Sequence, residues 1–325
     1  MRKLFLASAA FLIAMVASAA NASEVKVTPL GSHDGEFCAF DRAFVFEDPN
    51  GTRILFDASR TVAGAEDERL GNIDVVLLSH VHGDHLGDRH IPQANAGSCG
   101  EPDASINDTP NSNTVNIAVS KKAKIVVGSE MNDFLANKVN SVGGDPDSVK
   151  LVRFGASVDV KGVTITTVPA AHSNGLSGEF IEGDLGKSLE TAGLTAYVGP
   201  PTGYVLTFSN GLVVYLSGDT GVTAEQKTVV QEQYGASLAV INIGDTYTTG
   251  PTEAAYVVNE LIQPASVIPS HANEVATKKG EIIPDTKTDE FVNASNMPVY
   301  IPLSGQTMEF DSAGECVDGC QGLSE

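Results

Sequence analysis

Apolar residues fall into short runs along this chain, and polar segments rich in turn residues separate the runs. Two such runs within residues 43–59 flank Asn50-Gly51, a pair that is typical of a hairpin turn. Residues 202–220 repeat this pattern around Asn210-Gly211. The apolar run within residues 73–80, IDVVLLSH, indicates a strand that is buried on both faces of a sheet. Further strands are expected at residues 25–31, 122–130, 157–172, 237–244, 266–271 and 297–310.

Helical patterns lie between some of these strands. Residues 131–142 and 252–262 each predict a short helix, and residues 223–235 predict another. This last helix opens with Thr223 and has a glutamine three residues on, which is the capping-box pattern. Strands mixed with helices in this way are typical of an α/β layered architecture.

Two longer segments have neither pattern. A stretch rich in Asn, Gly, Ser and Pro, between Gln93 and Asn116, predicts a long surface loop. The glycine-containing residues 173–201 predict a second connection between strands. No segment reads as a linker, so residues 23–325 are expected to form a single domain with a cysteine-bearing C-terminal tail.

The first 22 residues have the pattern of a secretory signal peptide. Arg2 and Lys3 precede an apolar run from Leu4 to Val16, and Ala20-Asn21-Ala22 provides a small-x-small cleavage site. The apolar run is short for an uncleaved membrane anchor, and no other segment is long enough to cross a bilayer. The sequence therefore predicts an exported protein, periplasmic or secreted, whose mature chain begins at Ser23 and is not membrane-bound.

The composition is acidic. Lys and Arg together number 20 against 41 Asp and Glu, which gives a net charge of −21. Such a surface repels phosphate backbones and anionic membranes, so binding to nucleic acid by general attraction is excluded. The remaining partner that we expect is a small-molecule substrate, and the sequence favours no particular oligomeric state.

Export places the four cysteines in an oxidising compartment. Three pairings are open to them. Cys316 and Cys320 are close enough in sequence to pair with each other, which would leave Cys38 with Cys99. A zinc site built from all four is a poorer interpretation because neither pair has CxxC spacing. We expect structural disulfides.

The segment LLSHVHGDHLGD, residues 77–88, holds three of the seven histidines. His80 and His82 are two residues apart at the end of a strand, so both imidazoles face the same way. Gly83 then lets the chain turn, so Asp84 and His85 can point elsewhere. This arrangement suits two adjacent metal ions. A single histidine that ends a strand is more often a half-buried packing residue.

Further candidate ligands follow other apolar runs. Four runs end in a residue that can bind metal: His80, His172, Asp219 and His271. Because ligand sites in α/β sheets lie outside the carboxyl ends of the strands, these side chains could converge there. Imidazole nitrogen with carboxylate oxygen is a typical ligand set for catalytic zinc, and the two oxygens of Asp219 could bridge two cations. A complete set of this kind favours the metal interpretation over packing.

These motifs resemble a known family. SHVHGDHLGD is similar to the HxHxDH signature of the metallo-β-lactamase superfamily. AAHSNG, PTGYVLTFSNGLVVYLSGDTGVT, VINIGDTYTTGPTEAAYVV and ASVIPSHANE resemble the branch that contains L-ascorbate-6-phosphate lactonase and related metal-dependent hydrolases. The similarity runs from Val25 to about Phe310. It implies an αββα four-layer sandwich with the site at one edge of the two sheets.

The resemblance also implies roles for individual residues. Metal one takes His80, His82 and His172, metal two takes Asp84, His85 and His271, and Asp219 bridges them. Asp57 is implied to orient a ligand without binding metal. We expect two divalent ions, zinc in the first place, with manganese or iron as alternatives. From position alone, Tyr247 and Thr248 are candidates for the substrate pocket, whereas His33 and His90 are left outside the site.

The predicted function is hydrolysis of a small ester, a lactone in particular, by a metal-bound hydroxide. Asp84 is expected to orient this nucleophile and then to carry a proton to the leaving group. Phosphodiester or phosphate-ester hydrolysis is an alternative, slightly disfavoured because the ligand loops carry no arginine beyond Arg89. β-Lactam hydrolysis is a second alternative. A metal-binding protein without turnover is a third, which the complete ligand set disfavours. The export signal, the long loop and the cysteine-bearing tail are departures from the branch that these motifs resemble.

Overall fold

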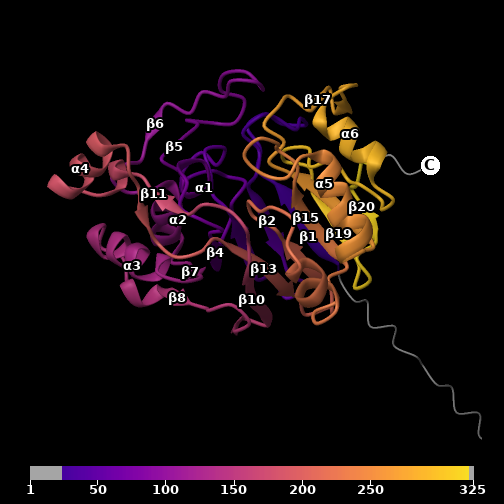
Figure 1. The fold of residues 1–325 in the computed structure, drawn as a ribbon, viewed down its shortest axis with the longest axis horizontal. Helices are drawn as coiled ribbons and strands as arrows, with labels where there is room; N and C mark the ends of the chain where they lie inside the picture. Colours follow the sequence, from indigo (N-terminus) through magenta and orange to yellow (C-terminus); the bar gives the residue numbers. More distant parts are fainter. Residues whose placement is uncertain (1–23, 322–325) are drawn as a thin grey trace, which may run out of the picture.

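Two β-sheets lie between two groups of helices in the computed structural model, which describes residues 24–321. Figure 1 shows α2 (Asn113–Lys121) and α3 (Met131–Ser141) on one side, and α5 (Pro251–Tyr256) and α6 (Lys287–Ala294) on the other. This arrangement confirms the αββα sandwich. The predicted signal peptide lies outside the described residues.

The first sheet has eight strands in the order β20-β19-β1-β2-β3-β4-β7-β8. Their bounds are Cys316–Asp318 (β20), Met308–Phe310 (β19), Val25–Pro29 (β1), Phe44–Glu47 (β2), Arg53–Phe56 (β3), Val75–Leu77 (β4), Lys124–Val127 (β7) and Val149–Leu151 (β8). From β3 to β8 the strands run parallel, so their carboxyl ends meet at one edge. The predicted hairpin around Asn50-Gly51 is confirmed as the antiparallel pair β2–β3.

The second sheet has six strands in the order β16-β15-β14-β13-β10-β9. Their bounds are Ser266–Ser270 (β16), Leu238–Asn242 (β15), Val213–Leu216 (β14), Thr202–Thr207 (β13), Val163–Pro169 (β10) and Ser157–Val160 (β9). β14, β15 and β16 are parallel, and β10 and β14 are both antiparallel to β13. The carboxyl ends of β10, β14, β15 and β16 therefore also share one edge.

Short elements complete the described chain. Three two-stranded pairs are β5 (Arg89–His90) with β6 (Ile106–Asn107), β11 (Gly175–Leu176) with β12 (Ala196–Tyr197), and β17 (Thr277–Lys278) with β18 (Glu281–Ile282). The remaining helical segments are α1 (Gly83–Leu86), α4 (Asp184–Ala192), the 3₁₀ turns η1 (Pro146–Ser148) and η2 (Gly178–Phe180), and the π-helical η3 (Gln226–Gln231) and η4 (Val257–Ile262). None of the helices within residues 24–321 combines the length and apolarity that a membrane span requires.

The space between the two sheets is filled by apolar side chains from alternate strand positions, such as Phe46, Phe56 and Leu206. A polar group from β13 also lies in this core. The hydroxyl of Tyr204 donates to the carbonyl oxygens of Leu78 at 2.7 Å and Val126 at 3.0 Å. Burial raises the pKa of this phenol well above its usual range, so it stays a neutral donor. The bond ties β13 to the ends of β4 and β7, next to the histidine-rich loop.

Several sequence predictions need correction. The loop prediction to Asn116 is wrong, because α2 begins at Asn113 with the Ser112 hydroxyl accepting from Val115 N at 3.2 Å. Residues 173–201 contain α4, which the pattern did not predict. The last β segment shrinks to Met308–Phe310, since Pro298 and Pro302 lack the N–H that strand pairing needs.

The helix predicted at residues 223–235 is shorter and π-helical. Its capping box is half formed: the Gln226 side chain accepts from Thr223 N at 2.9 Å, but the Thr223 hydroxyl has no hydrogen-bond partner. Gln226 therefore holds the start of the turn without the reciprocal bond.

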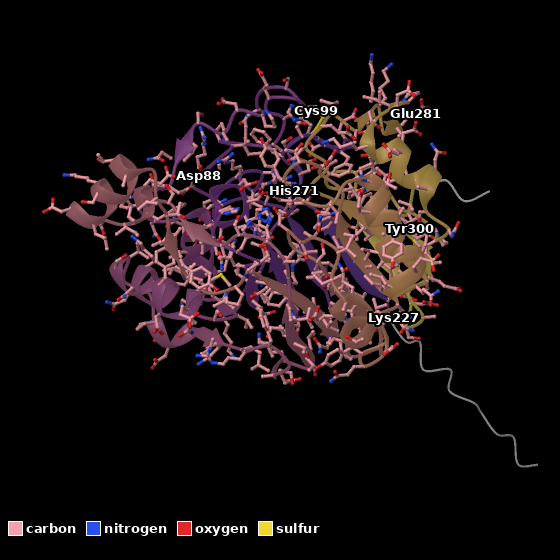
Figure 2. The ribbon with its side chains drawn as sticks, viewed as in Figure 1. Asp88, Cys99, Lys227, His271, Glu281 and Tyr300 are labelled. Carbon is pink, nitrogen blue, oxygen red and sulfur yellow. A yellow bond between two sulfur atoms is a disulfide. The ribbon has the colours of Figure 1, made fainter. Side chains whose placement is uncertain are left out.

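The cysteines form the two predicted pairs, Cys38–Cys99 and Cys316–Cys320. The first pair joins the connection between β1 and β2 to the long loop after β5, and Ala39 N donates to Cys99 O at 3.1 Å beside it. Figure 2 shows this disulfide at the Cys99 label. The long loop is therefore tied to the segment that leads into β2.

Candidate metal centre

The predicted ligands lie directly after strands whose carboxyl ends share an edge of their sheet. His80 follows β4, His172 follows β10, Asp219 follows β14, and His271 follows β16, each within three residues of the last strand residue. The loops are short, so the strand positions determine where these side chains go. His271 is labelled near the middle of the molecule in Figure 2, between the two halves of the sandwich.

One group of ligand atoms comes from His80, His82 and His172, and these atoms all lie within 4.8 Å of one another. Nε2 of His80 is 2.9 Å from Nδ1 of His82. His80 is fully buried, whereas His82 and His172 are half-buried. Burial lowers the pKa of each imidazole, most strongly at His80. An imidazole binds a divalent metal in its neutral form, and these three are close enough to one another to share one ion.

A second group comes from Asp84, His85 and His271. α1 is one turn long, and Asp84 and His85 both lie within it. Oδ2 of Asp84 is 3.6 Å from Nε2 of His271 and 3.9 Å from Nε2 of His85. Burial acts to raise the pKa of Asp84, but Arg42 and His85 hold it well below its usual range. This carboxylate is ionised.

Asp219 lies between the two groups. Its Oδ2 is 3.9 Å from Nε2 of His80, 3.7 Å from that of His172 and 3.3 Å from that of His271. Its Oδ1 is 3.3 Å from Nε2 of His85. For metal–ligand bonds of about 2.1 Å, tetrahedral geometry separates ligand atoms by about 3.4 Å. The observed separations fit two cations that share this carboxylate.

Two buried atoms of the cluster support this fit. Nε2 of His85 and Oδ1 of Asp219 have no hydrogen-bond partner. Buried polar atoms are almost always satisfied, and a bound cation would satisfy both. The residues present therefore fit the metal that the family resemblance implies.

Asp57 lies behind His85. Its Oδ2 accepts from Nδ1 of His85 at 2.7 Å, while Ser79 N donates to Oδ1 at 2.8 Å and the Ser79 hydroxyl donates to Oδ2 at 2.7 Å. This contact directs Nε2 of His85 toward the centre, which is the orienting geometry expected of Asp57. Burial acts to lower the pKa of His85, but Asp219, Asp57 and Asp84 raise it to about 10. The metal-free centre therefore holds one imidazolium.

Arg42 is a site residue that sequence reasoning missed. It precedes β2, its side chain is 4% exposed, and Nη1 contacts Oδ2 of Asp84 and donates to Nε2 of His271 at 2.7 Å. The apolar runs point to ligands where strands end, whereas Arg42 lies where a strand begins. A charged Asp-Arg pair directly before a buried apolar run was the available signal. The ligand loops carry no arginine beyond Arg89, but the segment before β2 brings Arg42 to the site, so the slight case against a phosphate ester loses its basis.

The remaining candidates lie outside the ligand cluster. The Tyr247 side chain is 70% exposed, and the Thr248 hydroxyl accepts from Gly244 N at 3.1 Å, so it shapes the loop after β15. Nδ1 of His90 is 2.6 Å from Oδ2 of Asp108. Nδ1 of His33 is 3.1 Å from the Ser32 hydroxyl. Neither histidine belongs to the groups of possible ligands found among the described residues.

Comparison with known proteins gives a consistent result. A family model described as a β-lactamase superfamily domain matches residues 41–271. A UPF0173 metal-dependent hydrolase from Cupriavidus metallidurans is 30% identical over 248 residues, which cover 74% of this chain and 71% of that protein. A second, from Polynucleobacter asymbioticus, is 27% identical over 94% of each chain. The structure of the metallo hydrolase Igni18 from Ignicoccus hospitalis has a TM-score of 0.56 at 22% identity, over 89% of this chain and 99% of that chain, which shows a common fold.

Proposed function

Since this chain belongs to the metallo-β-lactamase superfamily and is a metal-dependent hydrolase, we propose that its substrate is a small ester, and in particular a lactone. The observation that carries the proposal is the cluster of His80, His82, Asp84, His85, His172, Asp219 and His271 at the ends of the strands. Support for a lactone comes from the downstream motifs that resemble the ascorbate-phosphate lactonase branch.

We propose that the centre holds two divalent ions, with zinc as the first candidate. His80, His82 and His172 would hold one, Asp84, His85 and His271 the other, and Asp219 would contact both. Metal ions bound there would lower the pKa of water and polarise the scissile carbonyl. The ligand set of imidazoles with two carboxylates suits zinc, and it also accepts manganese or iron.

Asp84 is the carboxylate of the centre that can meet a substrate. Its side chain is 32% exposed, compared with 4% for Asp219. Because it is ionised, it can accept a hydrogen bond from the attacking water and orient it toward the carbonyl carbon. As the water oxygen bonds to the carbonyl carbon, Asp84 takes up the proton of the water and then passes it to the oxygen that leaves when the ester bond breaks. For a lactone the product is a single hydroxy acid.

We propose that the protein acts after export, in the periplasm or outside the cell. The predicted signal sequence and the two disulfides support this location, because disulfides persist in oxidising compartments.

Hydrolysis of a phosphate ester or phosphodiester is the second candidate, and Arg42 is the observation that favours it. A guanidinium beside the centre could neutralise charge on a phosphoryl group. In the present conformation Arg42 is buried against Asp84 and His271, so it would have to turn toward such a substrate. We therefore place this candidate after the lactone.

A substrate screen distinguishes these activities. The mature chain, reconstituted with zinc or manganese, is assayed against lactones, phosphodiesters, phosphate monoesters and β-lactams. We expect turnover of at least one lactone, and its loss after metal removal with a chelator. Turnover of phosphate esters alone would replace the lactone proposal with the second candidate. Metal binding without turnover of any of these classes would refute both.

A further inference from the structure

The two halves of the metal centre have different electrostatic surroundings. Arg42 contacts Oδ2 of Asp84 and Nε2 of His271, and both are ligand atoms of the second group. Within residues 24–321, no lysine or arginine side chain forms a hydrogen bond or ion pair with the three histidines of the first group. Among the described residues, the guanidinium of Arg42 therefore contacts ligand atoms of the second group and none of the first.

The backbone around Arg42 holds its guanidinium in place. Nε of Arg42 donates to Phe40 O at 3.1 Å. The carboxylate of Asp41 accepts from Ser32 N and Cys38 N, both at 2.8 Å, and Asp41 O accepts from His271 N at 3.3 Å. The segment that carries Arg42 is thus hydrogen-bonded to the backbone of His271, a residue of the second group. A side chain that is 4% exposed and held in this way does not leave its contacts freely.

A metal ion at the second group needs the same two atoms. A guanidinium that donates to Nε2 of His271 occupies the lone pair that would bind the cation. The cation would also share the carboxylate of Asp84 with a second positive charge at close range. No such competition exists at His80, His82 and His172. The second ion therefore has to bind where the positive charge of Arg42 already lies.

We propose that Arg42 is an internal competitor for the second metal ion, so that the centre fills in sequence. The first ion binds tightly at His80, His82 and His172, and the second binds weakly at Asp84, His85 and His271 after Arg42 gives up its contacts. The inference rests on the proposed metal centre, but it does not depend on which ester is the substrate.

Metal binding to the purified mature chain tests this inference. Zinc is titrated in the presence of a chromophoric chelator, and metal content is measured by mass spectrometry after desalting. We expect two binding steps in the wild-type chain, with the second at least tenfold weaker, and about one ion retained. Arg42→Met keeps the length of the side chain without its charge. It should tighten the second step at least tenfold and retain about two ions.

Arg53→Met is the matched control. Arg53 also pairs with a carboxylate, that of Glu47, but it begins β3 at the end opposite to Asp57. Its removal should leave both binding steps unchanged. Equal second-step affinities in the wild-type and Arg42→Met chains would overturn the inference. A chain that binds no metal at all would instead overturn the proposed metal centre, so the two failures differ.

A measurement on the wild-type chain covers the case in which Arg42→Met does not fold. With ¹⁵N-labelled arginine, the Nε–H resonance of Arg42 reports its bond to Phe40 O. We expect this resonance to stay in place during the first equivalent of zinc and to move during the second. A shift that is complete at the first equivalent would contradict sequential filling.

Discussion

The carboxylate of Asp57 lies 2.7 Å from Nδ1 of His85, so the opposite nitrogen of this imidazole faces the metal centre. Asp57 itself is held by the backbone N–H and hydroxyl of Ser79, and its backbone is left-handed with φ 45°. A residue in this conformation next to a ligand is typical of a position whose geometry the site requires. The contact determines which His85 nitrogen is available to metal.

Asp57→Asn should weaken binding of the second metal ion by about 10- to 100-fold, since the amide can no longer accept from both His85 and Ser79 as a charged group. Asparagine tolerates the left-handed backbone, so the fold should persist. Asp48→Asn is the matched control: Asp48 accepts from the N–H and hydroxyl of Ser209, away from the centre. Zinc titration of both variants checks this. An affinity for the second ion that is the same in Asp57→Asn as in Asp48→Asn would contradict the orienting role.

Asp84→Asn should lower kcat by about 10²- to 10⁴-fold, the range expected for a proton-transfer group. Asparagine has nearly the same shape and its amide oxygen can still accept from Arg42, so the fold should persist although the ion pair is lost. Steady-state kinetics on whichever ester is turned over, together with circular dichroism, make the measurement. A folded variant with wild-type kcat would rule out the role of Asp84 in proton relay.

Metal binding should release a proton. The pKa of His85 is raised to about 10 in the metal-free chain, so at pH 8 its imidazole is protonated and must lose a proton to bind metal. The other four ligand histidines have lowered pKa values and are already neutral. Zinc titration calorimetry at pH 8, in buffers with different ionisation enthalpies, should give at least one proton released per chain filled with two ions, since metal-bound water can lose a second. Release of none would mean that His85 is neutral before binding.

The same pKa shift gives a pH dependence for the stability of the metal-free chain. A histidine whose pKa is higher in the folded state stabilises that state fully below its unfolded pKa of about 6.5. This contribution is lost as the pH rises from about 6.5 to 10. The urea midpoint of the metal-free chain should fall over this range, and His85→Gln should make the decline smaller. An identical slope in the variant would assign the decline to other groups.

The two disulfides should differ in their contribution to stability. Cys38–Cys99 joins residues 61 positions apart, whereas Cys316–Cys320 spans 4. Loop-closure entropy predicts that loss of the first, by Cys38→Ser with Cys99→Ser, lowers the free energy of unfolding by about 4 kcal/mol. Loss of the second, by the matching pair of substitutions, should cost about 2 kcal/mol. Denaturant unfolding of both variants measures this, and equal costs would contradict the prediction.

The sequence alone was sufficient to locate most of the centre. His80, His82, Asp84 and His85 are adjacent in the chain, and each distant ligand follows a recognisable apolar run. Ligand chemistry and the end of a strand are both local properties, so they can be read from neighbouring residues. The hairpins at Asn50-Gly51 and Asn210-Gly211 were predictable for the same reason. Comparison with relatives then placed the chain in its superfamily.

Only the tertiary structure decided which side chains meet across the two sheets. Arg42 is 229 residues from His271 in sequence, yet the two are hydrogen-bonded. The bond depends on how the segment before β2 packs against the loop after β16, and local pattern does not encode that packing. The helix α4 was missed although Leu185, Leu189 and Ala192 are at helical spacing, because the glycines at 183, 186 and 193 are typical of a loop. Contacts between distant segments are determined by the packing of the whole core, which is why the sequence predicted the candidate ligands but not the guanidinium that contacts two of them.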